Sequence, residues 1–175
     1  PVLFENRLYW VSVGDSALWL YRDGELQRLT EDHSMAPQID AMYGDAPDAK
    51  EKALAHPDRN CLTSVLIGSD IPKIDCSERP VKLLHNDVLI LASDGLEFLD
   101  KANIAALLDR HSESHSRDIS HALLQAVSEL DDPDQDNVAL CVIRVCDTDM
   151  PKKHFSPKAA KATKQVTLLA SNGKS

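Results

Sequence analysis

Residues 88–95 read Val-Leu-Ile-Leu-Ala-Ser-Asp-Gly, an apolar run that ends in a polar turn. A strand with apolar residues on both faces is typical of the middle of a sheet, where both faces are covered. We therefore predict a central strand at Val88–Ser93. Its end would place the carboxylate of Asp94 at an edge of the sheet.

Other strands are expected on both sides of this run. Asp23-Gly24 separates two short apolar segments and predicts a tight hairpin. A strand at Val138–Val145, apolar apart from Arg144, closes the core. The remaining predicted strands are, in chain order, Leu8–Val13, which reads as buried, Ala17–Arg22, Leu26–Leu29, Cys61–Ile67 and Lys73–Arg79.

Two helices are predicted between the central strand and the last one. Asp100 is expected to cap the first, and Ser116 the second. Each has one apolar stripe, which predicts packing on a sheet. Strands with a helical pair before the last one predict an α+β fold dominated by antiparallel sheet. The expected inward residues are Ile104, Leu107, Leu108, Ile119, Leu123, Ala126, Val127 and Leu130.

Composition restricts the class of protein. The 175 residues are 43% hydrophobic and 27% charged, as in a globular domain. The net charge of -9 argues against nucleic acid as the main partner. The longest strongly apolar run, Val88–Ala92, is far shorter than a membrane span, and no signal-peptide layout precedes it, so we predict a cytoplasmic protein. The four cysteines form no CxxC pair and are read as reduced packing residues.

Two segments differ from the rest. Glu31–Pro57 is punctuated by proline and glycine, and only weak helices are predicted, around Met35–Met42 and Asp48–Ala55. Residues 147–175 contain six lysines against two aspartates and predict a flexible tail. We therefore expect one domain over residues 1–146, followed by this tail.

Three aspartates stand where predicted strands begin or end. Asp15 follows the first predicted strand, Asp94 follows the central strand, and Asp136 precedes the last strand. If the last two strands are antiparallel neighbours, Asp94 and Asp136 meet at one sheet edge. A divalent cation such as Mg²⁺ or Mn²⁺ would relieve their repulsion and could support phosphate-ester hydrolysis. Each aspartate by itself is also a common turn residue, so both interpretations stay open.

The sequence around these aspartates resembles the bacterial type 2C metal-dependent protein phosphatases. The resemblance covers roughly residues 8–145 and rests on matching blocks in the family's order. They are Val13-Gly14-Asp15-Ser16 with Tyr21-Arg22-Asp23-Gly24, Leu29-Thr30-Glu31-Asp32-His33-Ser34, His56-Pro57-Asp58-Arg59-Asn60-Cys61-Leu62-Thr63, and Leu91-Ala92-Ser93-Asp94-Gly95-Leu96 with Asp136-Asn137.

This resemblance implies a two-layer antiparallel β-sandwich flanked by helices, with two or three Mn²⁺ or Mg²⁺ ions at one edge. Asp94 and Asp136 match ligands of one core metal, and Asp15 matches a ligand of a weaker third metal. Residues 32–57 match the flap over the substrate channel. The implied activity is hydrolysis of phosphoserine and phosphothreonine by a metal-bridging hydroxide, and the implied partners are protein substrates of a serine/threonine kinase.

Several family features are missing from this sequence. The bridging aspartate, the phosphate-binding arginine and the general-acid histidine would lie upstream of Pro1, so no catalytic residue is assigned here. Ala17 stands where family members usually have an arginine, and Glu97-Phe98 is not the commonest sequence of the family after Gly95. We expect a domain incomplete at its N-terminus, weakly active or inactive, which self-associates through exposed sheet faces. The alternative is a non-catalytic, phosphatase-like regulatory or binding module.

Overall fold

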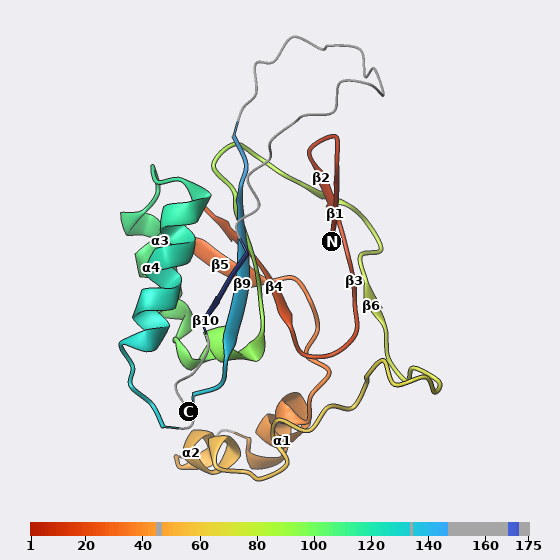
Figure 1. The fold of residues 1–175 in the computed structure, drawn as a ribbon. Helices are drawn as coiled ribbons and strands as arrows, with labels where there is room; N and C mark the ends of the chain where they lie inside the picture. Colours follow the sequence, from red (N-terminus) through yellow and green to blue (C-terminus); the bar gives the residue numbers. More distant parts are fainter. Residues whose placement is uncertain (45–46, 134, 147–167, 172–175) are drawn as a thin grey trace.

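The computed structural model describes residues 1–44, 47–133, 135–146 and 168–171. A five-stranded antiparallel sheet forms the centre, in the order β10-β9-β8-β4-β5 (Figure 1). The predicted central strand is confirmed as β8, with two strands on either side. The bounds are β4 Ala17–Arg22, β5 Glu25–Arg28, β8 Val88–Ala92, β9 Val138–Arg144 and β10 Leu168–Ser171.

Helices cover one face of this sheet, and smaller sheets lie on the other side (Figure 1). The helices are α3 (Lys101–Arg110) and α4 (Ser116–Ser128). The smaller sheets have the orders β1-β2-β7 and β3-β6. The expected α+β fold with antiparallel sheets is confirmed. The bounds of the smaller strands are β1 Val2–Phe4, β2 Arg7–Tyr9, β3 Val11–Ser12, β6 Asp75–Cys76 and β7 Val81–Lys82.

Alternate residues of β8 belong to two different cores. Ile90 packs in the cluster beneath α3 and α4, whereas Leu89 packs with Leu8, Leu18 and Leu83 toward the smaller sheet. Both β8 side chains are completely buried. Because successive side chains of a strand point to opposite faces, one apolar run can serve both cores. This explains why the run at 88–92 lacks polar alternation.

The predicted hairpin joins β4 to β5 through two residues in the left-handed region. Asp23 has φ 50° and Gly24 has φ 85°, as the tight turns of β-hairpins require. The strand register then places Trp19 opposite Arg28. The turn therefore determines which side chain stands at the far end of β5.

Replacing Gly24 with alanine should destabilise the fold by about 1 kcal/mol, because a Cβ disfavours positive φ. No heavy atom of the described residues lies within 4 Å of the position where that Cβ would sit, so the cost is conformational. Urea denaturation should show a lower midpoint with an unchanged slope. An unaffected midpoint would contradict the turn assignment.

The predicted buried strand at Leu8–Val13 is wrong in part. It divides into β2 and β3 at Trp10, whose backbone N–H donates to Ser77 Oγ at 3.2 Å instead of continuing the first ladder. Leu8 is fully buried, but Val11 is 69% exposed. An apolar run therefore continues here past the point where the sheet stops covering it.

The strands predicted at Cys61–Ile67 and Lys73–Arg79 are also largely wrong. The first contributes one bridge, between Ser34 and Leu62, and the second contributes only β6. Ser64 Oγ accepts a hydrogen bond from Lys73 N at 3.1 Å and donates to Lys73 O at 2.6 Å. These bonds close a loop and use backbone groups that a neighbouring strand would need. Leu66 and Ile67 remain more than 70% exposed.

The flanking segments differ from the sequence analysis in detail. The two weak helices form as α1 (Ala36–Tyr43) and α2 (Ala49–Leu54). Asp100 stands at the N-cap of α3 without a side-chain cap bond, whereas His115, rather than Ser116, is the N-cap of α4. All four cysteines are free, as expected, but only Cys141 is partly buried, so packing does not explain the other three. The predicted tail at 147–175 lies outside the described residues except for β10, which pairs with β9.

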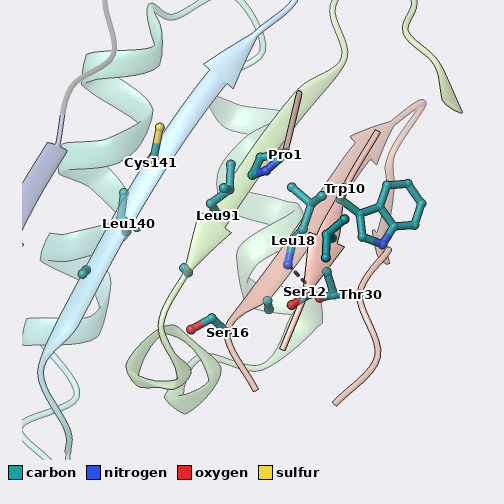
Figure 2. A pocket seen from close by; sticks show the side chains of 13 residues that line it. Pro1, Trp10, Ser12, Ser16, Leu18, Thr30, Leu91, Leu140 and Cys141 are labelled. Atoms are coloured by element: carbon teal, nitrogen blue, oxygen red, sulfur yellow. Dashed lines mark hydrogen bonds between the residues drawn. The ribbon is translucent and has the colours of Figure 1, made fainter. Parts of the chain in front are cut away.

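An apolar hollow of about 320 Å³ opens between the five-stranded sheet and the strands opposite it. Figure 2 shows Leu91, Leu140 and Cys141 on one side of it and Trp10 on the other. Burial raises the pKa of the Cys141 thiol. The hollow is lined mainly by carbon, and none of the three aspartates is among the residues that line it. Self-association through the sheet faces stays a prediction.

No helix among the described residues combines the length and apolar character that crossing a membrane requires.

Candidate functional site

Asp94 and Asp136 stand at one edge of the sheet because β8 and β9 are antiparallel neighbours. β8 ends at Ala92, and η1 (Asp94–Phe98), a 3-10 helix, begins two residues later. Ser93 N donates to Ala139 O at 2.9 Å, and Ala139 N donates to Ser93 Oγ at 3.0 Å. These bonds extend the β8–β9 contact into the segment that carries Asp136. The geometry expected from the strand ends is therefore present.

Gly95 allows the two segments to approach each other closely. A Cβ at this position would lie 2.6 Å from the backbone oxygen of Asn137 and 2.9 Å from Val138 Cγ2. Real Cβ atoms do not come so near to a backbone oxygen, so any larger residue must push η1 away from β9. In the Asp94-Gly95 pair, Asp94 therefore brings a carboxylate to this edge, and Gly95, which has no side chain, lets η1 lie close to β9.

Asp15 approaches the same edge from the turn between β3 and β4. β4 pairs with β8 so that Ala17 stands opposite Ala92, and this register brings the 14–16 turn beside the end of β8. Gly14 adopts φ 105°, a conformation that favours glycine. The turn therefore reverses the chain so that Asp15 stands near the start of η1.

His33 holds this turn from behind. It is fully buried, and its ring Nδ1 accepts a hydrogen bond from Gly14 N at 3.2 Å, while its backbone N–H donates to Gly14 O at 3.2 Å. Its carbonyl accepts from Thr63 N at 2.7 Å. His33 thus joins the Asp15 turn to the start of the 32–57 segment and to Thr63, which follows that segment. These contacts give His33 a structural role.

The three aspartates influence one another electrostatically. Partial burial raises the pKa of Asp94, and the negative charges of Asp15 and Asp136 raise it further. The backbone N–H of Gly95 opposes this effect only in part, because the net direction is upward. Repulsion between like charges falls off with distance. The structure therefore brings the three predicted residues into one acidic neighbourhood.

The chemistry of these donors fits a hard divalent cation. Carboxylate oxygens are what Mg²⁺ and Mn²⁺ prefer, and a cation would remove the repulsion that raises the pKa of Asp94. Within the described part of the chain, however, no three side chains of histidine, cysteine, aspartate or glutamate converge in a metal-holding arrangement. The donor types are suitable, and a complete coordination shell is not formed by these residues alone.

Arg28 is a residue of this region that the sequence analysis did not identify. Its Nη2 donates to the backbone oxygen of Asp15 at 2.6 Å, and its Nη1 donates to Glu97 Oε1 at 2.7 Å. The guanidinium also lies 5.8 Å from the centre of the Trp19 ring, within cation–π range. The hairpin register could have revealed it, because a two-residue turn at 23–24 places residue 28 opposite Trp19.

A cleft of about 590 Å³ adjoins the acidic neighbourhood. It is lined by residues of α1, including Asp40, by Glu97 of η1 and Lys101 of α3, and by Arg28 and Arg59. Arg59 pairs with Asp40, Nη1 to Oδ1 at 2.5 Å, and Asp40 holds the pKa of Arg59 above its ordinary value. The cleft wall therefore combines apolar surface with side chains of both signs of charge.

The known proteins that this chain resembles in sequence are bacterial protein phosphatases. No family model matches the chain. It is 29% identical to the serine/threonine protein phosphatase PstP of Mycobacterium tuberculosis (strain CDC 1551 / Oshkosh) over 145 residues, which is 82% of this chain and 26% of that protein. The chain thus spans about a quarter of the length of this curated relative.

Solved structures agree with this match. The serine/threonine phosphatase of S. agalactiae superposes with a TM-score of 0.68 at 26% identity, covering 82% of this chain and 56% of that one. The catalytic domain of PstP in complex with 2 manganese ions superposes with a TM-score of 0.60 at 26% identity, covering 83% and 56%. Both similarities extend over most of the described residues. Over most of its length the chain is therefore similar, in sequence and in fold, to bacterial serine/threonine phosphatases.

Proposed function

We propose that the protein containing this chain is a metal-dependent phosphatase that removes phosphate from serine and threonine residues of proteins. The observation that supports this most directly is the acidic neighbourhood of Asp15, Asp94 and Asp136, where the pKa of Asp94 is raised by burial and by the other two charges. Arg28, which binds the backbone of Asp15, also lines an open cleft that carries charged side chains. Such a cluster of carboxylates is suited to binding cations, which would remove the repulsion between the negative charges.

In this proposal Asp94 and Asp136 hold one of two core Mn²⁺ or Mg²⁺ ions, and Asp15 contributes with Asp94 to a weaker third site. Bound ions supply Lewis acidity, which polarises a phosphoryl oxygen and acidifies a water molecule. The residues of this chain orient the ligands: Gly95 sets the approach of η1 to β9, and Ser93 joins them by hydrogen bonds. The manganese complex of PstP supports manganese as the ion to test first.

Residues 32–57 would act as the flap over the substrate. The support is that residues of α1 and of η1 line the same cleft. The substrates would be phosphoproteins made by a serine/threonine kinase. A cytoplasmic location and a flexible tail at 147–175 stay predictions from composition.

We also propose that residues 1–175 by themselves are weakly active or inactive. The described side chains do not converge into a three-ligand group, so further ligands would come from water or from elsewhere in the whole protein. A non-catalytic regulatory module is the competing possibility. It would gain if the whole protein neither binds Mn²⁺ nor hydrolyses phosphoproteins.

The function is tested by hydrolysis of a phosphothreonine peptide by the full-length protein. Turnover should require Mn²⁺, stop on addition of EDTA, and fall at least about tenfold in Asp136→Asn, since losing a ligand weakens metal binding. Asp23→Asn is the matched control, because that carboxylate stands in the distant hairpin turn. Equal loss in both variants, or turnover that survives EDTA, would overturn the assignment.

A further inference from the structure

Arg28 occupies a position between two of the candidate ligand loops. One arm of its guanidinium binds the backbone oxygen of Asp15 at 2.6 Å, and the other binds Glu97 Oε1 at 2.7 Å. Glu97 belongs to η1, whose first residue is Asp94. The same side chain therefore contacts the turn that carries Asp15 and the short helix that carries Asp94.

We propose that Arg28 and Glu97 form a clamp that sets the separation of the Asp15 turn and η1, and so determines how tightly this edge binds a divalent cation. The proposal rests on the metal-dependent function above. Arg28 is a positioning residue here. It contacts the Asp15 turn and η1, and none of its hydrogen bonds or ion pairs with the described residues goes to the carboxylate of Asp15 or Asp94.

The surroundings of the clamp favour a fixed geometry. The Arg28 side chain is 17% exposed, against 38% for Glu97. It lies over the buried Trp19 ring, 5.8 Å from its centre, and Lys101 Nζ lies 5.1 Å from the same ring. A planar guanidinium packed on an aromatic face and bonded at both arms has little rotational freedom. The geometry is therefore that of a brace rather than of a loose surface pair.

The charges around Glu97 are consistent with a pair built into the site. Burial raises the pKa of Glu97, the positive charge of Arg28 lowers it, and Asp32 and Asp15 raise it again. Asp32 Oδ2 also lies 3.8 Å from Arg28 Nη1. Arg28 thus pairs with both Glu97 and Asp32, and all three residues line the cleft.

The experiment uses the full-length protein and compares Mn²⁺ binding by calorimetry with kcat and KM for a phosphopeptide. Arg28→Met should weaken Mn²⁺ binding about tenfold or more, because partners that orient metal ligands typically contribute that much. The peptide KM should change less than the Mn²⁺ affinity. Glu97→Gln should give a smaller loss, and adding it to Arg28→Met should cost little more, because both remove one interaction.

Arg144→Met is the matched control. That guanidinium is also a two-armed brace, binding Ser114 O at 2.8 Å and Asn86 Oδ1 at 3.0 Å, but it stands at the opposite end of the sheet, in the pair with Val88. It should leave the affinity for Mn²⁺ unchanged. Arg28→Lys should bind Mn²⁺ more tightly than Arg28→Met but more weakly than the parent protein, because one ammonium does not reproduce a planar fork.

Two outcomes overturn the clamp: equal Mn²⁺ affinities for Arg28→Met and Arg144→Met, or full recovery with Arg28→Lys, which would show that only the charge matters. Failure of the proposed function has a different signature. In that case the unmodified protein shows no Mn²⁺-dependent hydrolysis, and the calorimetric comparison of the variants still decides whether Arg28 affects metal binding.

Discussion

Asp94→Asn should lower Mn²⁺-dependent phosphopeptide hydrolysis by about a thousandfold while making the metal-free protein more stable at neutral pH. The loss follows because a catalytic metal contributes several kcal/mol to the transition state, and each 1.36 kcal/mol is a factor of ten. The gain follows because the folded protein holds this carboxylate partly buried and beside two like charges. Function and stability should therefore change in opposite directions.

The pH dependence of this gain is determined by the raised pKa of Asp94. An acid whose pKa is raised by folding binds its proton more tightly in the folded state, so its favourable contribution is present at low pH and is lost as pH rises through the folded pKa. Asparagine cannot ionise, and it keeps an oxygen that can accept the Gly95 N–H. Its advantage should be present at pH 7 and vanish below the ordinary aspartate pKa of about 4.

Thermal melting in EDTA at pH 7 and near pH 3.5 tests this prediction, with Asp23→Asn as control. The melting temperature of Asp94→Asn should exceed that of the parent at pH 7 only. A variant that melts lower than the parent at pH 7 in EDTA would show that the carboxylate is held by favourable contacts and that the acidic neighbourhood is wrongly described.

Gly95→Ala should damage both stability and activity. The new Cβ would lie 2.6 Å from the Asn137 backbone oxygen, and a backbone atom cannot rotate away as a side chain can. Overpacking of this kind costs about 1–3 kcal/mol. The shift of η1 away from β9 would misplace Asp94 relative to Asp136, and a displacement near 1 Å can cost about a hundredfold in rate.

The matched control for this variant is Gly24→Ala, which also adds one methyl group but meets no described atom within 4 Å. Denaturation and phosphopeptide kinetics of the two variants separate the effects. Gly24→Ala should lose stability and keep its kcat. An active Gly95→Ala protein with the parent's kcat would show that the close approach of η1 and β9 does not determine the site.

Much of the fold could be predicted because its central residues have only one suitable environment. The run at 88–92 is apolar on both faces, and the Asp23-Gly24 turn fixes the register of β4 and β5. The failures have a common cause. Leu66 and Ile67 read as strand residues, yet a ladder also requires a free partner, and Ser64 already binds the backbone of Lys73. The hydrophobicity of a segment can be read from that segment alone, whereas strand pairing depends on two segments.

The candidate site divides in the same way. Asp15, Asp94 and Asp136 could be found because strand ends are visible in the sequence and because antiparallel neighbours bring those ends together. The role of Arg28 could not be predicted in the same way. Its importance lies in two bonds to residues 13 positions before it and 69 positions after it.

The sequence by itself determined the central strand, the hairpin, the helix pair and the three strand-end aspartates, because each depends on local patterns of polarity and turn residues. Only the tertiary structure decided how near Gly95 comes to Asn137, that the acidic charges raise the pKa of Asp94, and that Arg28 joins the Asp15 turn to η1. Those features depend on distances between segments remote in the chain, and such distances arise only when the sheet is assembled.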